Sequence, residues 1–152
     1  MTKQETKAEL LAKFREWIGY VQELEPLDWE KPIEDGKWSV HGLVSHLMGW
    51  DKYFWEEAIQ PISQDQPVTL QELDFDVFNR ESVEFGRSKP KSELTQLAVH
   101  YRQMIIETIE GLDEERFSRT YGDFTVDSYL RDFIWHDHHH RSQIEARKAY
   151  LV

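Results

Sequence analysis

Apolar residues recur at intervals of three and four along most of this chain, and this spacing limits it to a helical fold. The pattern marks four long segments, at about residues 7–24, 40–59, 92–112 and 125–152. Ser39 stands where the second helix needs an N-cap, Pro26 follows the first helix, and Gly111 stands at the end of the third. No segment alternates with the two-residue period of a half-buried strand. We therefore predict an all-α protein.

The connection between the second and third helices is long and contains Pro61 and Pro67. Within it, residues 70–89 could form a short helix that crosses the bundle. The 152 residues suit one domain with a hydrophobic core, and an aromatic share of 13% indicates a packed interior. Four long helices with one long connection predict a four-helix bundle, spanning residues 1–152 as a single domain.

The composition excludes several classes of function. Because the chain has no cysteine, any metal must be bound by His, Asp or Glu, and no cysteine nucleophile is available. The net charge of -11 repels the phosphates of nucleic acids and of anionic lipids. The sequence contains no apolar run of about 18 residues and no apolar stretch near its N-terminus, which argues against a membrane span and a signal peptide. We expect a soluble, cytoplasmic protein that binds neither nucleic acid nor membrane.

Four of the seven histidines lie in the segment IWHDHHHRSQI, residues 134–144. At about 100° per residue, His136 and His140 fall one turn apart at the edge of the apolar stripe of the last helix. His138 falls on the opposite face, and His139 is also displaced from the pair. Two imidazoles at positions i and i+4 can bind one ion, but such a pair is more often an ordinary polar feature of a helix surface.

On the second helix, His46 occupies the matching edge of an apolar stripe. Two facing helix edges in a bundle can bring three imidazole nitrogens together and leave coordination positions for water or substrate. The alternative is three polar residues around an ordinary cleft. His41 is expected at the surface, and His100, on the third helix, is a candidate for an additional ligand.

Two stretches of the sequence are similar to those of the DinB-like (YfiT-like) proteins. They are KWSVHGLVSHLMGWDKYF, in which a Trp-Ser pair opens a helix carrying one metal-ligating His, and WHDHHHRSQI, which resembles the family's His-x-x-x-His-Arg-x-Gln-Ile segment. The resemblance implies a four-helix bundle with a divalent metal on His46, His136 and His140. Ser142 replaces a usual Gly and Gly42 a common Glu, and neither change removes a ligand.

The resemblance further implies a small-molecule enzyme. It is either a metal-dependent hydrolase or a transferase that joins a low-molecular-weight thiol, such as bacillithiol or mycothiol, to an electrophile. Imidazole ligands suit Zn, Ni and Fe alike, so the metal stays open. Tyr53 is a candidate donor to a developing anion, Gln143 could orient substrate, and Arg147 could attract a carboxylate. Each can equally be read as an edge aromatic, a solvated amide or a surface cation.

Asp137 points into the apolar stripe and therefore needs a partner, either a ligand imidazole, Arg141 or a cation from another helix. Asp51 is expected to face Arg141, and Tyr129 to lie beside the histidines. Two other interpretations remain: a non-catalytic metal- or ligand-binding bundle, and a bundle without metal. Exposed apolar residues on long helices make a homodimer plausible.

Overall fold

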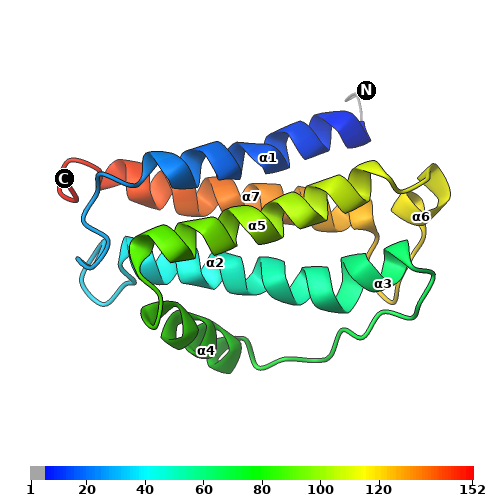
Figure 1. Cartoon of the computed structure of the whole chain (residues 1–152), viewed down its shortest axis with the longest axis horizontal. Helices are drawn as coiled ribbons and strands as arrows, with labels where there is room; N and C mark the ends of the chain where they lie inside the picture. The colour runs from blue at the N-terminus through cyan, green and yellow to red at the C-terminus, as the bar shows by residue number, and fades with distance from the viewer. Residues whose placement is uncertain (1–5) are drawn as a thin grey trace.

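The computed structural model describes residues 6–152, and these form helices joined by loops (Figure 1). The four long helices are α1 (Lys7–Glu23), α2 (Val40–Phe54), α5 (Lys91–Glu110) and α7 (Val126–Ala146). The shorter elements are the π-helical turn η1 (Trp55–Ile59), α3 (Gln60–Ser63), α4 (Phe75–Arg87) and α6 (Glu114–Ser118). Within the described residues there are two isolated β-bridges and no strand. The predicted all-α four-helix bundle is confirmed.

Capping residues set where the two histidine-bearing helices begin. The Oγ of Ser39 accepts a hydrogen bond from the backbone N of Gly42 at 3.2 Å, so α2 is capped without the Glu that is common at that position. Thr125 and Ser128 form a reciprocal capping box at the start of α7, with both hydrogen bonds at 2.9 Å. The start of each helix is thereby fixed relative to its histidines.

The last helix is shorter than the apolar pattern suggests. It ends at Ala146, and the chain then turns back, so that Leu151 is buried by the turn and not by a helix. The carbonyl oxygen of Leu151 accepts a hydrogen bond from the N of Asp28 at 2.7 Å. The prediction of a helix to residue 152 was therefore wrong at its end. A buried Leu in register with the stripe cannot by itself distinguish a helix from a turn.

The apolar core consists of two clusters at opposite ends of the bundle. One joins the first half of α1 to η1, the second half of α5 and the start of α7. The other joins the second half of α1 and the loop after it to α2, the start of α5, the end of α7 and Leu151. Between them lies a layer of buried polar side chains, comprising Asp51, Arg102, Asp137, His46 and His140. This polar layer contains the candidate site.

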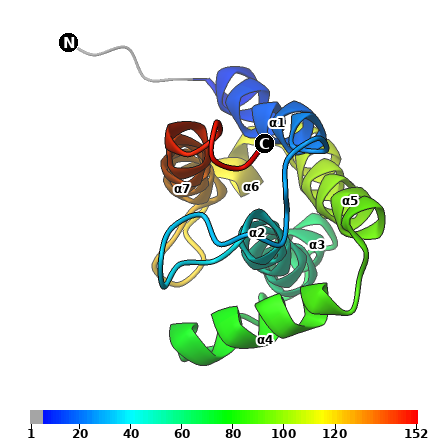
Figure 2. The ribbon, with the colours of Figure 1, turned by 90° about the vertical axis from the view of Figure 1, so that its left-hand side faces the viewer.

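Helix α4 packs on the outer side of α2, with its first turns on the side of α7 (Figure 2). Two glycine–serine contacts allow the close approach. A Cβ at Gly86 would lie 1.8 Å from the Oγ of Ser45, and a Cβ at Gly49 would lie 2.3 Å from the Oγ of Ser82. The predicted crossing helix is thus present, and it can pack closely on α2 because these two glycines have no side chain.

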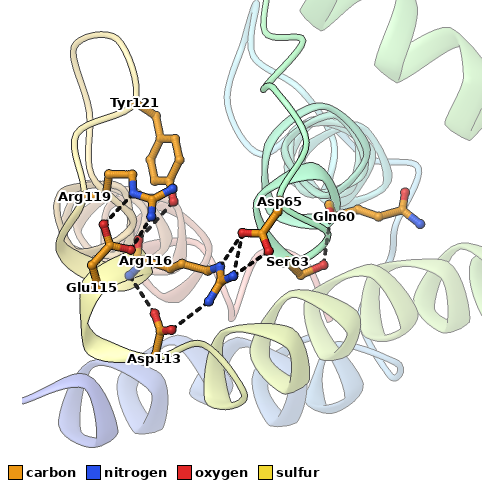
Figure 3. A network of polar contacts seen from close by, with 8 residues as sticks. All are labelled: Gln60, Ser63, Asp65, Asp113, Glu115, Arg116, Arg119 and Tyr121. Carbon is orange, nitrogen blue, oxygen red and sulfur yellow. Dashed lines mark hydrogen bonds and ion pairs between the residues drawn. The ribbon is translucent and has the colours of Figure 1, made fainter.

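A surface network connects α6 to the turn after α3 (Figure 3). The guanidinium of Arg116 donates to the carboxylate of Asp65 through Nε, at 2.9 Å, and through Nη2, at 2.6 Å. It also donates to Asp113 at 2.7 Å. These hydrogen bonds lower the pKa of Asp65. Because the carboxylates are exposed, the network orients α6 and contributes little to stability.

Candidate metal centre

His46 from α2 and His136 and His140 from α7 converge on one point in the polar layer. One ligand nitrogen from each lies within 4.8 Å of the others, and the Nε2 atoms of His136 and His140 are 3.0 Å apart. We call this group the histidine triad. His46 is 5% exposed and His140 9% exposed, so water reaches the triad from a limited direction.

Asn79 of α4 fixes the proton on His46. The indole Nε1 of Trp50 donates to Asn79 Oδ1 at 2.9 Å, and an indole nitrogen can only donate. The Asn79 atom that lies between Trp50 and His46 is therefore the amide oxygen. The Nδ1 of His46, which lies 2.9 Å from the same oxygen, must then carry a proton and donate it. The Nε2 of His46 is left with its lone pair towards the other two histidines.

Gln143 acts in the same way on α7. Its Oε1 lies 2.8 Å from the Nδ1 of His140, so that Nδ1 donates and Nε2 carries the lone pair. Two ring nitrogens of the triad are thus directed by amide oxygens from two different helices. Metal-binding histidines almost always donate their outer N–H to an oxygen acceptor, most often a carboxylate, a backbone carbonyl or a water.

Burial keeps the triad uncharged. The pKa of His46 is lowered to about 3, chiefly by burial and further by the neighbouring His140 and His136. The pKa of His136 is lowered to about 4, and that of His140 is also lowered, in both cases chiefly by burial. All three imidazoles are therefore neutral at pH 7, and a metal ion would not have to displace protons to bind.

The donor set fits a divalent ion. Imidazole nitrogens bind zinc at about 2.0–2.1 Å, which places ligand nitrogens about 3.3 Å apart around a tetrahedral ion. The 3.0 Å between the Nε2 atoms of His136 and His140 is close to that value, and a small outward shift of either ring would reach it. Three neutral nitrogens leave a tetrahedral ion with one further position.

An arginine on α5 sets the distance between the two helices that carry the triad. Arg102 is fully buried, and its five N–H groups are all used. They donate to Asp51 of α2 at 2.9 and 3.4 Å, to Asp137 of α7 at 2.6 and 3.1 Å, and to the carbonyl oxygen of Phe14 of α1 at 3.0 Å. One side chain thus connects all four long helices, and Asp137 directly follows His136.

This network corrects one expectation and confirms another. Asp51 does not face Arg141, whose guanidinium lies over the ring of Tyr20 at 4.5 Å. Asp137 does pair with a cation from another helix, as one of its predicted options required. Arg102 itself was not predicted. The available signal was its four-residue spacing from Ala98 together with two buried carboxylates in need of a cation.

The predicted site residues are distributed around the triad. Gln143 contacts it directly. Tyr53 lies one turn after Trp50, and its hydroxyl accepts a hydrogen bond from the N of Gln71 at 2.9 Å. Arg147 caps the end of α7 and donates from Nε to the carbonyl oxygen of Ile33 at 3.0 Å. The structure thus brings Gln143 to the histidines and directs Tyr53 and Arg147 to neighbouring loops.

Three other histidines and Tyr129 lie outside the triad. His138 and His139 are exposed and lie outside the triad, as expected. His100, a candidate for an additional ligand, is exposed beside Tyr101 and is not part of the triad. Tyr129 is not beside the histidines but in the core, stacked on Phe54 at 3.2 Å between ring centroids. Its angular position was right, but it lies two turns from His136 along the helix.

Two cavities border the triad. The first, which we call the loop cavity, has a volume of about 290 Å³ and is lined by His140, Gln143 and part of the loop before α2, including Lys37 and Trp38. The second, which we call the aromatic cavity, has a volume of about 520 Å³. It is lined by His46, His136, Asn79, Asp132 and the rings of Trp50, Phe75, Phe133 and Trp135. Both volumes suit small molecules or parts of them.

Comparison with known proteins agrees with the fold. Residues 9–144 match the DinB superfamily. Among solved structures, the chain is similar to YfiT from Bacillus subtilis, described as a probable metal-dependent hydrolase with an unusual four-helix bundle topology. The TM-score is 0.74 at 16% sequence identity, and the match covers 99% of this chain and 90% of YfiT. A comparison with curated proteins finds none that matches.

Proposed function

The chain belongs to the DinB superfamily, and from that premise we propose that it is a divalent-metal-dependent hydrolase of a small molecule. The observation that carries the proposal is the histidine triad. Its three ligand nitrogens lie within 4.8 Å of one another at the wall of a cavity of about 520 Å³. The likeness to YfiT, a probable metal-dependent hydrolase, supports the same reaction type.

Each residue of the centre has a defined part in this proposal. His46, His136 and His140 would hold the ion, which in such a site lowers the pKa of a bound water and polarises a carbonyl or phosphoryl oxygen. Asn79 and Gln143 hold the outer nitrogens of His46 and His140. The rings of the aromatic cavity would exclude bulk water from the reacting group of the substrate.

A thiol S-transferase is the second candidate, and the loop cavity favours it. This cavity reaches the triad beside His140 and is distinct from the aromatic cavity, so two substrates could approach at once. Two charged side chains, Lys37 and Glu34, lie at its wall, and the lysine could pair with a carboxylate of an acidic thiol such as bacillithiol. Because the chain has no cysteine, the thiol must arrive as a cosubstrate, its thiolate forming the new C–S bond as the leaving group departs.

The roles of Tyr53 and Arg147 towards substrate stay predictions, as do a homodimer and a cytoplasmic location. Among residues 6–152, no helix has the length and hydropathy needed to cross a membrane. The metal is proposed to be Zn, Ni or Fe, since three imidazoles accept each of them.

A paired assay tests the two reactions. Protein loaded separately with Zn, Ni or Fe(II) is incubated with p-nitrophenyl esters and phosphates, and with 1-chloro-2,4-dinitrobenzene in the presence and absence of cysteine or bacillithiol. Hydrolysis that is lost in His46→Ala supports the first proposal. Thioether formation and chloride release that require both thiol and metal support the second. Metal binding without turnover across a broad substrate panel would favour a non-catalytic metal-binding bundle.

A further inference from the structure

The walls of the aromatic cavity consist mainly of four rings from three helices. Trp50 comes from α2, Phe75 from α4, and Phe133 and Trp135 from α7. The Trp50 and Phe75 rings are 5.6 Å apart between centroids and nearly perpendicular, at 73°. Aromatic rings from three helices thus line one space. Such an arrangement is used in proteins to bind quaternary and alkylated ammonium groups.

Two of these rings are exposed in a way that folding alone does not require. Trp135 is 68% exposed and Phe75 is 65% exposed, although both have large apolar surfaces. The Trp135 ring is stacked on the ring of His139, 5.4 Å between centroids and 3° between planes, so one face of the indole is packed. Grouped aromatic exposure at the mouth of a cavity indicates a ligand-binding surface.

One helical turn from the position proposed for the metal, a single charged side chain of the cavity favours a ligand of positive charge. Among the described residues that line the cavity, Asp132 is the one acidic side chain, and neither lysine nor arginine is present. Asp132 lies one helical turn before His136, so its carboxylate and the triad occupy neighbouring parts of the same wall. The net charge of -11 adds an attraction for cations over the whole molecule.

We propose that the aromatic cavity binds an organic cation, an alkylated ammonium group that forms one end of the substrate. The ammonium lies between Asp132 and the exposed rings, and the reacting group extends one turn further along α7 to the triad. Because it names the substrate class of the metal centre, this inference rests on the proposed function. Its recognition chemistry, however, uses only the carboxylate and the rings, so it can be measured without turnover.

Three probes of nearly equal shape separate charge from size. Choline, 3,3-dimethylbutan-1-ol and 3,3-dimethylbutanoate carry a positive, a neutral and a negative group, respectively, on a similar branched frame. Binding is measured by titrating each into protein of known metal content and following the indole N–H signals by NMR. Choline is expected to bind at least about tenfold more tightly than the neutral alcohol, and the anion more weakly than either.

Matched variants assign the preference to the cavity. Asp132→Asn should reduce the choline preference to about threefold or less, and Trp135→Ala should weaken choline binding about tenfold. Asp123→Asn, which removes the same charge from an exposed loop outside the cavity, should leave the preference unchanged. Circular dichroism spectra identical to those of the native protein show that the variants are folded.

The inference is overturned if the native protein binds the alcohol or the anion as tightly as choline, or if Asp132→Asn keeps the full preference. Elemental analysis of the same samples separates this result from the failure of the metal proposal. A choline preference in protein that never binds metal would support the cation site and refute the metal-dependent function. A bound metal without the preference would do the reverse.

Discussion

Replacing Arg102 by methionine should destabilise the bundle more than any surface change. The substitution keeps much of the side-chain volume but removes five hydrogen bonds and the only charge that compensates two buried carboxylates among the described residues around it. Asp51 is 0% exposed and Asp137 is 8% exposed, so water cannot replace the guanidinium at Asp51 and can do so only in part at Asp137.

The size of the effect follows from the buried pairs. Breaking one buried ion pair by removing a partner costs about 3–5 kcal/mol, and here one arginine serves two carboxylates. We expect a loss of about 4–5 kcal/mol, which for a urea m-value of about 2 kcal/mol/M lowers the unfolding midpoint by about 2 M. Part of the loss should be recovered at low pH. Burial already raises the pKa of Asp51 to about 6, and without Arg102 this pKa rises further.

The sign of the pH dependence is fixed by that shift. A carboxylate whose pKa is raised in the folded state favours folding below its unfolded pKa of about 3.9 and loses this contribution as the pH rises through the folded pKa. The deficit of Arg102→Met should therefore be larger at pH 8 than at pH 5. Urea unfolding followed by far-UV circular dichroism at both pH values measures it.

Two further variants control this experiment. In Asp51→Leu/Arg102→Met/Asp137→Leu, the whole polar group becomes apolar, and its loss of stability should be smaller than that of Arg102→Met alone. Arg119→Met removes an exposed arginine paired with Glu115 and should leave the midpoint nearly unchanged. A loss below about 1 kcal/mol in Arg102→Met, or a triple variant less stable than the single one, would refute the reasoning.

Three other predictions concern the site and its support. Asn79→Leu should weaken metal binding by about 10–100-fold in a chelator competition, because the Nδ1 of His46 loses its acceptor; unchanged affinity would contradict the tautomer assignment. Gly86→Ala should destabilise the protein by about 1–3 kcal/mol in urea unfolding, and adding Ser45→Gly should restore part of the loss; without any such rescue, the steric account fails. The lowered pKa values of His46 and His136 mean that the stability of metal-free protein is constant above about pH 7. It should then fall as the pH drops below about 6.5, by about 1.4 kcal/mol per unit for each histidine, partly offset below about pH 6 by Asp51, whose raised pKa has the opposite effect. Constancy down to pH 5 would contradict the lowered histidine pKa values.

The four long helices and the grouping of the triad could be predicted because both depend on helical periodicity. Apolar stripes on the second and last helices also fix the angular positions of His46, His136 and His140, and the structure brings these side chains together. The same angles separate His138 and His139 from the group. Which residues share a helix face depends only on the local sequence. The contribution of each helix to the triad could therefore be predicted from that helix alone.

The supporting residues could not be predicted in this way because they depend on how helices meet. Asn79 reaches His46 only because α4 packs closely on α2 through Gly86 and Gly49, and no periodicity reports that packing. Arg102 occupies a core position that a charged residue rarely takes, and its two partners lie 51 and 35 residues away in the sequence. Angular position alone also misplaced Tyr129, since it carries no information on height along the helix.

Elemental analysis of tag-free protein tests the central claim most directly. Native protein and a His46→Ala/His136→Ala variant are reconstituted with Zn, Ni or Fe(II), dialysed mildly and analysed for bound metal per chain. The account predicts about one divalent ion per native chain and a near-complete loss in the variant. Native protein that retains none of the three metals, or a variant that retains as much as the native chain, would contradict a metal centre at His46, His136 and His140.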